Sequence, residues 1–178
     1  MARRKKSEFD PTKHFVLNDI KLWSCSLSRD GDYQHHLHEG KCVLQSFRKA
    51  TPEFFRAEVE GEEGSPVLLR VLVDLGVRSV FERGDDLGTT DGEEEDVLYT
   101  VEATFAADYF VVEPPESAEH LRAFVDLNAV HNVWPFWRQH VVDTLRRASL
   151  PVPSVPLMAK PGNAPKKQVR RLAPLIPS

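Results

Sequence analysis

Apolar and polar residues alternate along several stretches of the first two thirds of the chain, which is the period of a β-strand with one covered face. The clearest stretch runs from Val67 to Val77, where every second residue is Val or Leu. The stretch from Phe15 to Leu27 also alternates, but its phase changes near Lys21, which predicts a β-bulge. Alternation returns over residues 54–60 and 97–112, and is weak over residues 33–47.

The period becomes helical after Pro114 and Pro115, which end the last strand. A short helix should open at Pro115 or Ser117 and lead into a corner at residues 128–132. Its inward-facing residues are expected to be Leu121, Phe124, Val125 and Val130.

A longer helix is predicted to begin close to Trp134, because Pro135 suits a first turn, where its missing N–H breaks no helical bond. Apolar residues at helical spacing then predict one buried face, made of Trp137, Val141, Leu145 and Ala148. Pro151 ends this helix, since the residue before a proline is pushed out of the α region. The prolines that follow should hold residues 150–158 in an extended conformation outside the sheet.

Strands in succession followed by two helices indicate an α+β fold: a four-stranded antiparallel sheet with the long helix on its apolar face. The large apolar residues around Trp134 and Phe110 exceed what the inner faces of such a fold can hold. We therefore expect a symmetric homo-oligomer or a groove for an apolar partner. The predicted folded domain spans residues 14–158. A basic arm (1–13) and a basic, proline-containing tail (159–178) are expected to be disordered.

Composition excludes several other classes. Thirteen prolines and a net charge of -4 argue against a helical bundle and against a globally basic nucleic-acid binder. No apolar run approaches the ~20 residues of a membrane span, and no apolar region follows the first basic residues as in a secretory signal. We expect a soluble cytoplasmic protein without membrane insertion, with Cys25 and Cys42 as reduced, buried thiols on strands.

Candidate metal and catalytic residues are few. His35, His36 and His38 invite a metal site, since two of them would share a strand face, but no further ligand has a recognisable spacing. The acidic segment 82–96 lacks the ligand pattern of an EF-hand and is predicted to be a long connection. His140 and Asp143 would share a helix face as a solvated pair. No catalytic motif is present, so we expect neither enzyme activity nor a metal or other cofactor.

One motif at the start of the long helix is more specific. An asparagine and two apolar residues precede Pro-aromatic-x-Arg, and a Leu-Pro exit with a later Pro-Leu follows the helix: Asn132, Val133, Trp134, Pro135, Phe136, Trp137 and Arg138, then Leu150, Pro151, Pro156 and Leu157. This pattern resembles the SecB family of export chaperones and their SecB-like relatives, over roughly residues 15–158. The resemblance implies a dimer of dimers that holds unfolded polypeptide in apolar grooves without ATP.

The resemblance also implies positions for the groove and for partners. Its candidate client-binding residues are Tyr109, Phe110, Trp134, Phe136, Trp137, Leu157 and Met158. In the family, acidic residues on the outer sheet face receive the ATPase SecA; Glu102 matches, but Ser24 and Ser28 stand where acids are expected. General protein export, protection of an antitoxin in a toxin-antitoxin system, and a non-chaperone adaptor with one folded partner all remain open.

Overall fold

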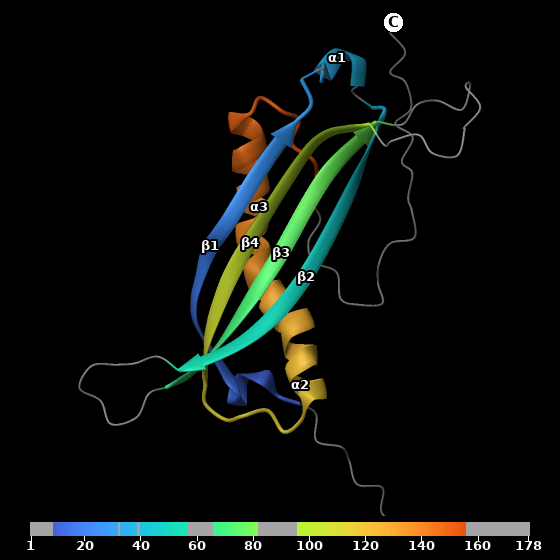
Figure 1. The fold of residues 1–178 in the computed structure, drawn as a ribbon. Coiled ribbons are helices and arrows are strands. Elements are labelled where there is room, and N and C mark those ends of the chain that lie inside the picture. Colours follow the sequence, from blue (N-terminus) through green and yellow to red (C-terminus); the bar gives the residue numbers. More distant parts are fainter. Residues whose placement is uncertain (1–8, 32, 39, 57–65, 82–95, 156–178) are drawn as a thin grey trace, which may run out of the picture.

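The computed structural model describes residues 9–31, 33–38, 40–56, 66–81 and 96–155. They form one antiparallel four-stranded sheet in the order β1-β4-β3-β2, with a helical layer across one face (Figure 1). The elements are β1 (Phe15–Arg29), α1 (His35–His38), β2 (Cys42–Arg56), β3 (Val67–Phe81), β4 (Val97–Val111), α2 (Ala118–Ala123) and α3 (Val130–Arg147). The predicted α+β architecture is confirmed, and oligomerisation stays a prediction.

Strand β1 contains the irregularity that the sequence predicts. Its pairing with β4 shifts register between Leu17 and Asp19 and again between Leu22 and Ser24, on either side of Lys21. Each shift leaves one extra residue on β1, and the second of them, Trp23, points to the sheet face opposite the helices, where Arg70 meets its ring. The two bulges allow apolar residues to return to the helix-facing side after each change of phase.

Strand β2 differs from the prediction. Residues 42–56 form one long strand, whereas alternation suggested two separate pieces, and the region of the histidines forms the short helix α1. Pro52 interrupts the sequence pattern, yet it is tolerated because β2 lies at the edge of the sheet, where a backbone N–H is not needed for a second partner. His36 and His38 therefore do not share a strand face.

The helical layer is longer and more continuous than expected. Ser117 caps α2 by accepting a hydrogen bond from the His120 backbone N–H, and a π-helical turn (Phe124–Ala129) leads directly into α3. The predicted corner at residues 128–132 is absent, and Pro135 lies inside α3 instead of opening it. Burial of Val130 and Val133, about 1.5–3 kcal/mol each, offsets the roughly 3 kcal/mol that an interior proline costs.

The core lies between α3 and the two central strands. The predicted inward face of the helix is confirmed for Trp137, Val141 and Leu145, all of which are fully buried. Opposite them stand the odd-numbered residues of β3 and β4, among them Leu69, Val71, Val73, Leu75, Val101, Phe105 and Tyr109. One helix thus covers the middle of the sheet.

After α3 the chain reverses direction and runs back along the helix. Ser149 adopts φ 55°, and the Leu150 N–H donates to the Leu145 carbonyl at 2.9 Å, which closes the last turn. Residues 150–155 then run without regular structure past β3 and β4, as the sequence predicts. Tyr99 Oη donates to the Pro151 carbonyl at 3.3 Å, and Arg138 Nε donates to the Val155 carbonyl at 3.1 Å. Residues 156–158 lie outside the described chain.

Structure begins earlier than the sequence suggests. Phe9 stacks between His14 and His120, with ring centroids 5.2 and 4.5 Å away, and a 3-10 turn (Pro11–Lys13) follows it. Residues 9–13 therefore join the folded domain. The rest of the predicted arm (1–8) and the predicted tail (159–178) lie outside the described residues.

The cysteines, the candidate metal ligands and the acidic segment lie as follows. Both cysteines are unpaired and lie on strands, but Cys25 is exposed and Cys42 only partly buried, because β1 and β2 are edge strands that the helix does not cover. Among the described residues no group of His, Cys, Asp and Glu is arranged to hold a metal ion. Within that part of the chain, no helix has the length and apolar character needed to cross a membrane. Residues 82–95 of the predicted acidic connection lie outside the described residues.

Candidate functional site

Two of the aromatic residues proposed for a client groove belong to the core. Tyr109 and Trp137 are each 1% exposed. The Tyr109 hydroxyl accepts a hydrogen bond from Asn132 Nδ2 at 3.0 Å, and burial raises the pKa of Tyr109 to about 12. The structure therefore places these two side chains between α3 and the sheet, where they pack the helix against the strands.

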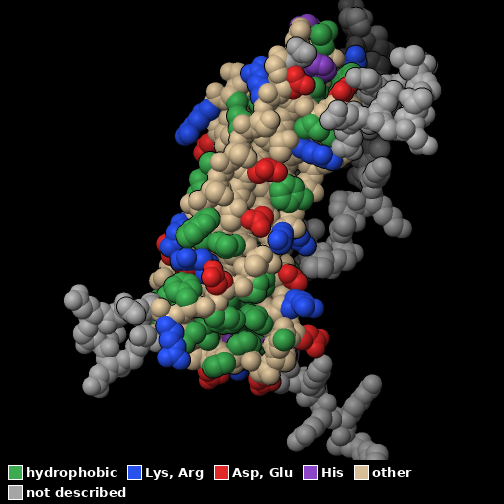
Figure 2. Space-filling view, in the orientation of Figure 1, with side chains coloured by type: hydrophobic (Ala, Val, Ile, Leu, Met, Phe, Trp, Pro, Cys, Tyr) green, Lys and Arg blue, Asp and Glu red, His purple; other side chains and the backbone are tan. Residues whose placement is uncertain are grey.

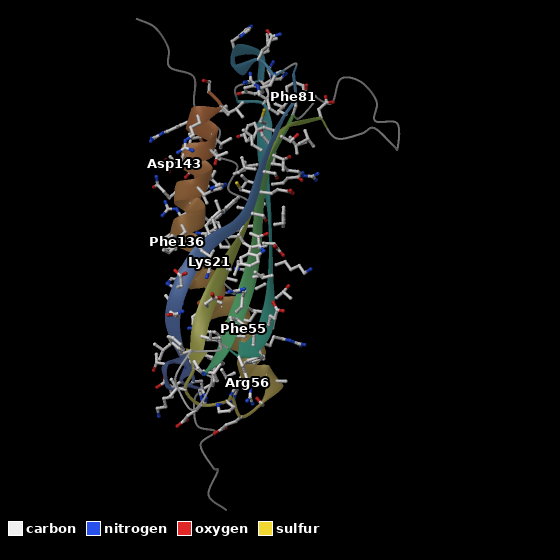
Figure 3. The ribbon with its side chains drawn as sticks, turned by 60° about the vertical axis from the view of Figure 1, so that its left-hand side comes forward. Lys21, Phe55, Arg56, Phe81, Phe136 and Asp143 are labelled. Atoms are coloured by element: carbon white, nitrogen blue, oxygen red, sulfur yellow. The ribbon has the colours of Figure 1, made fainter. Side chains whose placement is uncertain are left out.

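The other described candidates lie on different surfaces. Phe110 is 39% exposed and sits on the sheet face opposite the helices, whereas Phe136 is 49% exposed and projects from α3. Figure 3 shows Phe136 and Asp143 on the helical layer and Lys21 and Phe55 on the sheet. Trp134 is half-buried against the core. Leu157 and Met158 lie outside the described residues, so a single groove containing all seven residues is not formed by the described chain.

The first exposed apolar surface is the helix-facing side of β1. Leu17, Leu22 and Leu27 pair with the core residues Tyr109, Phe105 and Val101, yet each is 40–47% exposed. Phe136 lies one turn before His140, whose ring meets Phe105 edge-on, so it borders the same side of the helix. We call Leu17, Leu22, Leu27 and Phe136 the β1 strip. It follows a sheet edge whose backbone groups have no strand beside them in the described chain.

The second surface is a pocket of about 220 Å³ on the β2 side of the helical layer. We call it the exit pocket, because the chain leaving α3 forms one wall. Its lining comprises Tyr33, His38, Gly40, Cys42, Leu44, Ser79, Tyr99, Pro151, Val152 and Pro153.

Aromatic rings give the exit pocket its shape. Tyr33 meets Tyr99 edge-on at 6.3 Å between ring centroids and stacks on His38 at 5.5 Å, while His38 meets Phe81 edge-on at 5.1 Å. Burial raises the pKa of Tyr99, whose hydroxyl anchors Pro151. Aromatic walls beside prolines form the kind of groove that accepts extended, proline-rich or apolar chain.

Sequence reasoning missed this pocket. Its residues come from four distant segments, and Tyr33 and Tyr99 look like ordinary strand residues in the sequence. One signal was available: the apolar exit after α3 must pack against something, and tyrosines at strand ends supply both an apolar ring and a hydrogen-bonding hydroxyl.

The third surface is the outer sheet face, opposite the helices. One row of apolar residues crosses all four strands in register, and Figure 2 shows apolar side chains gathered over this end of the sheet: Val16, Phe110, Leu68 and Phe55. Trp23 and Phe47 add exposed rings farther along.

A charged cluster stands directly beside that apolar row. Arg70 forms a bidentate pair with Asp108, at 2.7 and 2.9 Å, and its guanidinium lies 4.9 Å from the ring centroids of both Trp23 and Phe55. Lys21 Nζ adds a third contact to Asp108 at 3.0 Å. The Arg70 hydrogen bonds, followed by that of Lys21, lower the pKa of Asp108 despite its burial.

Glu102 lies on this outer face and is exposed, next to Ser26 and Gly76 in the sheet. A shallow hollow of about 530 Å³ includes Glu102 and Asp74 together with Lys49. Ser24 lies on the same face, and Ser28 does too by its pairing with Thr100. The charges of this region are mixed, so the described residues do not form a purely acidic surface.

Comparison with known proteins identifies the fold. No protein-family model and no curated protein sequence match the chain. Solved structures do match, among them the Mycobacterium tuberculosis SecB-like chaperone Rv1957 in complex with a ChAD peptide from the antitoxin HigA1 (Rv1956). The identity is 15%, the TM-score is 0.54, and the match covers 83% of this chain and 93% of that chain. The likeness confirms the SecB-like fold that the helix-start motif implies.

Proposed function

We propose that this protein is a cytoplasmic, ATP-independent chaperone that binds unfolded or partly folded polypeptide through apolar surface contacts. One observation carries the proposal: large apolar side chains lie exposed on both flanks of the helical layer, at the β1 strip and at the exit pocket. A monomer rarely exposes such contiguous apolar surface without a partner. The SecB-like fold supports this function, since the matched structure is a chaperone holding a peptide.

We assign the client site to the exit pocket. It has aromatic walls and a proline-containing wall, so a client segment can lie beside residues 151–153 and bury its apolar side chains against Leu44 and Val152. Each buried Leu- or Phe-sized side chain contributes about 1.5–3 kcal/mol, and ordering the client offsets part of this gain. A single pocket therefore binds weakly, and several pockets on one oligomer raise the avidity.

We assign the β1 strip to self-association. Apolar residues beside an unpaired strand edge match the needs of a two-fold partner, because a second β1 can satisfy the edge while its Leu side chains cover Leu22 and Leu27. A dimer of dimers is the assembly we propose. Replacing Leu22 and Leu27 by Asp should halve the mass in sedimentation velocity or reduce it further, whereas Leu127→Asp, at an exposed leucine on the π-helical turn, should leave it unchanged.

A dedicated client is favoured over general export. The matched chaperone holds a peptide from an antitoxin, and the mixed charge around Glu102 offers little of the acidic surface that SecA docking needs. We therefore propose an antitoxin-like client, with SecA as a weaker candidate partner for Glu102. Glu102→Lys should leave client binding unchanged and, if SecA binds here, abolish that interaction in a pull-down.

The main test is suppression of aggregation without nucleotide. Substoichiometric oligomer should keep chemically unfolded citrate synthase from scattering light, and Leu44→Asp or Val152→Asp should weaken this effect by several fold. Leu127→Asp serves as the matched control for an added surface charge. If the wild-type chain fails to suppress aggregation yet co-purifies stoichiometrically with one folded protein, the protein is an adaptor and the proposal is overturned.

A further inference from the structure

One wall of the exit pocket is formed by the segment that follows α3. Leu150 and Val155 are buried, and between them the chain runs against Tyr99 and along α3 to Arg138. The segment Leu150–Val155 is apolar and proline-rich, so it shows which kind of chain this side of the molecule accepts. Val152 remains 40% exposed at the pocket wall.

The same kind of sequence recurs later in the chain. Residues 172–178 read Leu-Ala-Pro-Leu-Ile-Pro-Ser, which repeats the apolar and proline composition of Leu-Pro-Val-Pro-Ser-Val at residues 150–155. Four basic residues, Lys166, Lys167, Arg170 and Arg171, come before this apolar segment in the sequence. Its Leu and Ile side chains gain free energy when they leave water for an apolar surface such as the wall formed by Leu44 and Val152.

Residues 172–176 are also within reach of the pocket. Leu172 follows Val155 by 17 residues. A chain of that length has a typical end-to-end distance of about 23 Å and a fully extended reach of about 55 Å. The 18 residues of α3 span only about 27 Å, so the whole β2 flank of the helical layer lies within this range.

We infer that residues 172–176 bind in the exit pocket as an internal competitor of clients, with Leu172, Leu175 and Ile176 as the apolar side chains that enter it. This inference rests on the proposed chaperone function and adds its regulation. A tethered segment has an effective concentration of about 1 mM. If its own dissociation constant is about 0.1 mM, it weakens apparent client affinity about tenfold, so only clients that bind more tightly displace it.

The first experiment compares client affinity with and without the competitor. The probe is reduced, carboxymethylated α-lactalbumin, which stays unfolded, and its dissociation constant is measured by fluorescence anisotropy. The triple variant Leu172→Ser, Leu175→Ser and Ile176→Ser should bind the probe about tenfold more tightly than the full chain. A charge control with Lys166→Ser, Lys167→Ser and Arg170→Ser should change affinity less than twofold. The inference would be overturned if the full chain and the apolar variant bound the probe equally tightly. It would also be overturned if the charge control increased the affinity for the probe as much as the apolar variant does.

The second experiment locates the competitor. A labelled synthetic peptide of residues 168–178 should bind the apolar triple variant and be displaced by the probe. Leu44→Asp in that background should abolish peptide binding, whereas Leu127→Asp should retain it. Peptide binding that survives Leu44→Asp overturns the assignment to the exit pocket. The two proposals can be told apart by their failure. If the variants bind the probe tightly but not the peptide, only the internal competitor is contradicted. If no variant binds the probe, the chaperone function itself is contradicted.

Discussion

The charged cluster on the outer sheet face should be the most sensitive polar site in the fold, and Asp108→Asn tests it. Asp108 is almost fully buried and joins three strands, through Arg70 on β3 and Lys21 on β1. The substitution keeps the shape of the side chain and removes its charge. One carboxylate oxygen that accepted from Arg70 Nη2 and Lys21 Nζ becomes an amide donor facing two cations.

The magnitude follows from the partners' exposure. Removing one member of a fully buried ion pair costs about 3–5 kcal/mol, and hydrogen bonds to charged groups contribute about 1.5–3 kcal/mol. Arg70 and Lys21 keep 21% and 41% of their side chains exposed, so water compensates part of the loss. We expect the free energy of unfolding to fall by about 2 kcal/mol at pH 7.

The same cluster predicts a pH dependence. The folded-state pKa of Asp108 is lowered, so its contribution to stability is complete above about pH 5 and is lost as the pH falls through the ordinary carboxyl range toward the folded-state pKa. The stability difference between wild type and Asp108→Asn should therefore stay constant from pH 7 to about pH 5 and shrink below it.

The assay is urea unfolding followed by tryptophan fluorescence, at one protein concentration because self-association shifts apparent stability. Asp19→Asn is the matched control, since Asp19 contacts the same Lys21 at 3.3 Å but is exposed, and exposed pairs contribute less than about 1 kcal/mol. If Asp108→Asn costs no more than Asp19→Asn, or if its effect does not depend on pH below 5, the cluster does not stabilise the fold as argued.

Three further changes test local features of the fold. Gly76→Ala should cost about 1 kcal/mol, because a Cβ at Gly76 would collide with the ring of Phe47, and a double-mutant cycle with Phe47→Ala should remove most of that cost. Tyr109→Phe should cost about 1 kcal/mol at neutral pH through the lost Asn132 hydrogen bond. Because the Tyr109 pKa is about 12 in the folded wild type, the free energy of unfolding of the wild type should fall by up to about 1.4 kcal/mol per pH unit above pH 10. The Tyr109→Phe variant should lack this decrease, which urea unfolding at pH 8 to 11 would measure. Ser149→Gly should raise the midpoint of thermal unfolding by a few degrees, because Ser149 adopts φ 55°, a backbone conformation that glycine accepts without strain; an unchanged or lower midpoint would contradict this.

Sequence patterns predict the fold where one residue type dominates a face. The interior strand β3 and the buried face of α3 show clean periods because both are buried over most of their length, so most of their inward positions hold large apolar residues. Edge strands are under weaker selection of this kind. Strand β2 is mostly exposed on both faces, so its apolar and polar residues do not alternate regularly. Pro52 also suggests a break in the strand, so the sequence pattern could not show that residues 42–56 form one strand.

Pro135 shows a second limit of local rules. A proline is most often found in the first turn of a helix, and that preference predicts a start near Trp134. The start at Val130 is decided by tertiary packing, because Val130 and Val133 fill the core above β4 and the π-helical turn before them connects α2 without a break. The candidate site was harder still, since the rings of the exit pocket meet only after residues 33, 99 and 151 are brought together by the fold.

The two exposed flanks follow from simple dimensions. Four strands about 4.8 Å apart make a sheet about 14 Å wide between its outer strand axes, and side chains widen it further, whereas one α-helix with its side chains covers about 10 Å. A single helix therefore buries the helix-facing side of β3 and β4 and leaves β1 and β2 uncovered, which is the burial pattern observed. On the β2 flank, residues 150–155 supply a partial cover from within the chain. On the β1 flank no described residue does so, and Leu17, Leu22 and Leu27 remain exposed. The asymmetry is why we assign a transient occupant to the β2 side and a permanent one, a second copy, to the β1 side.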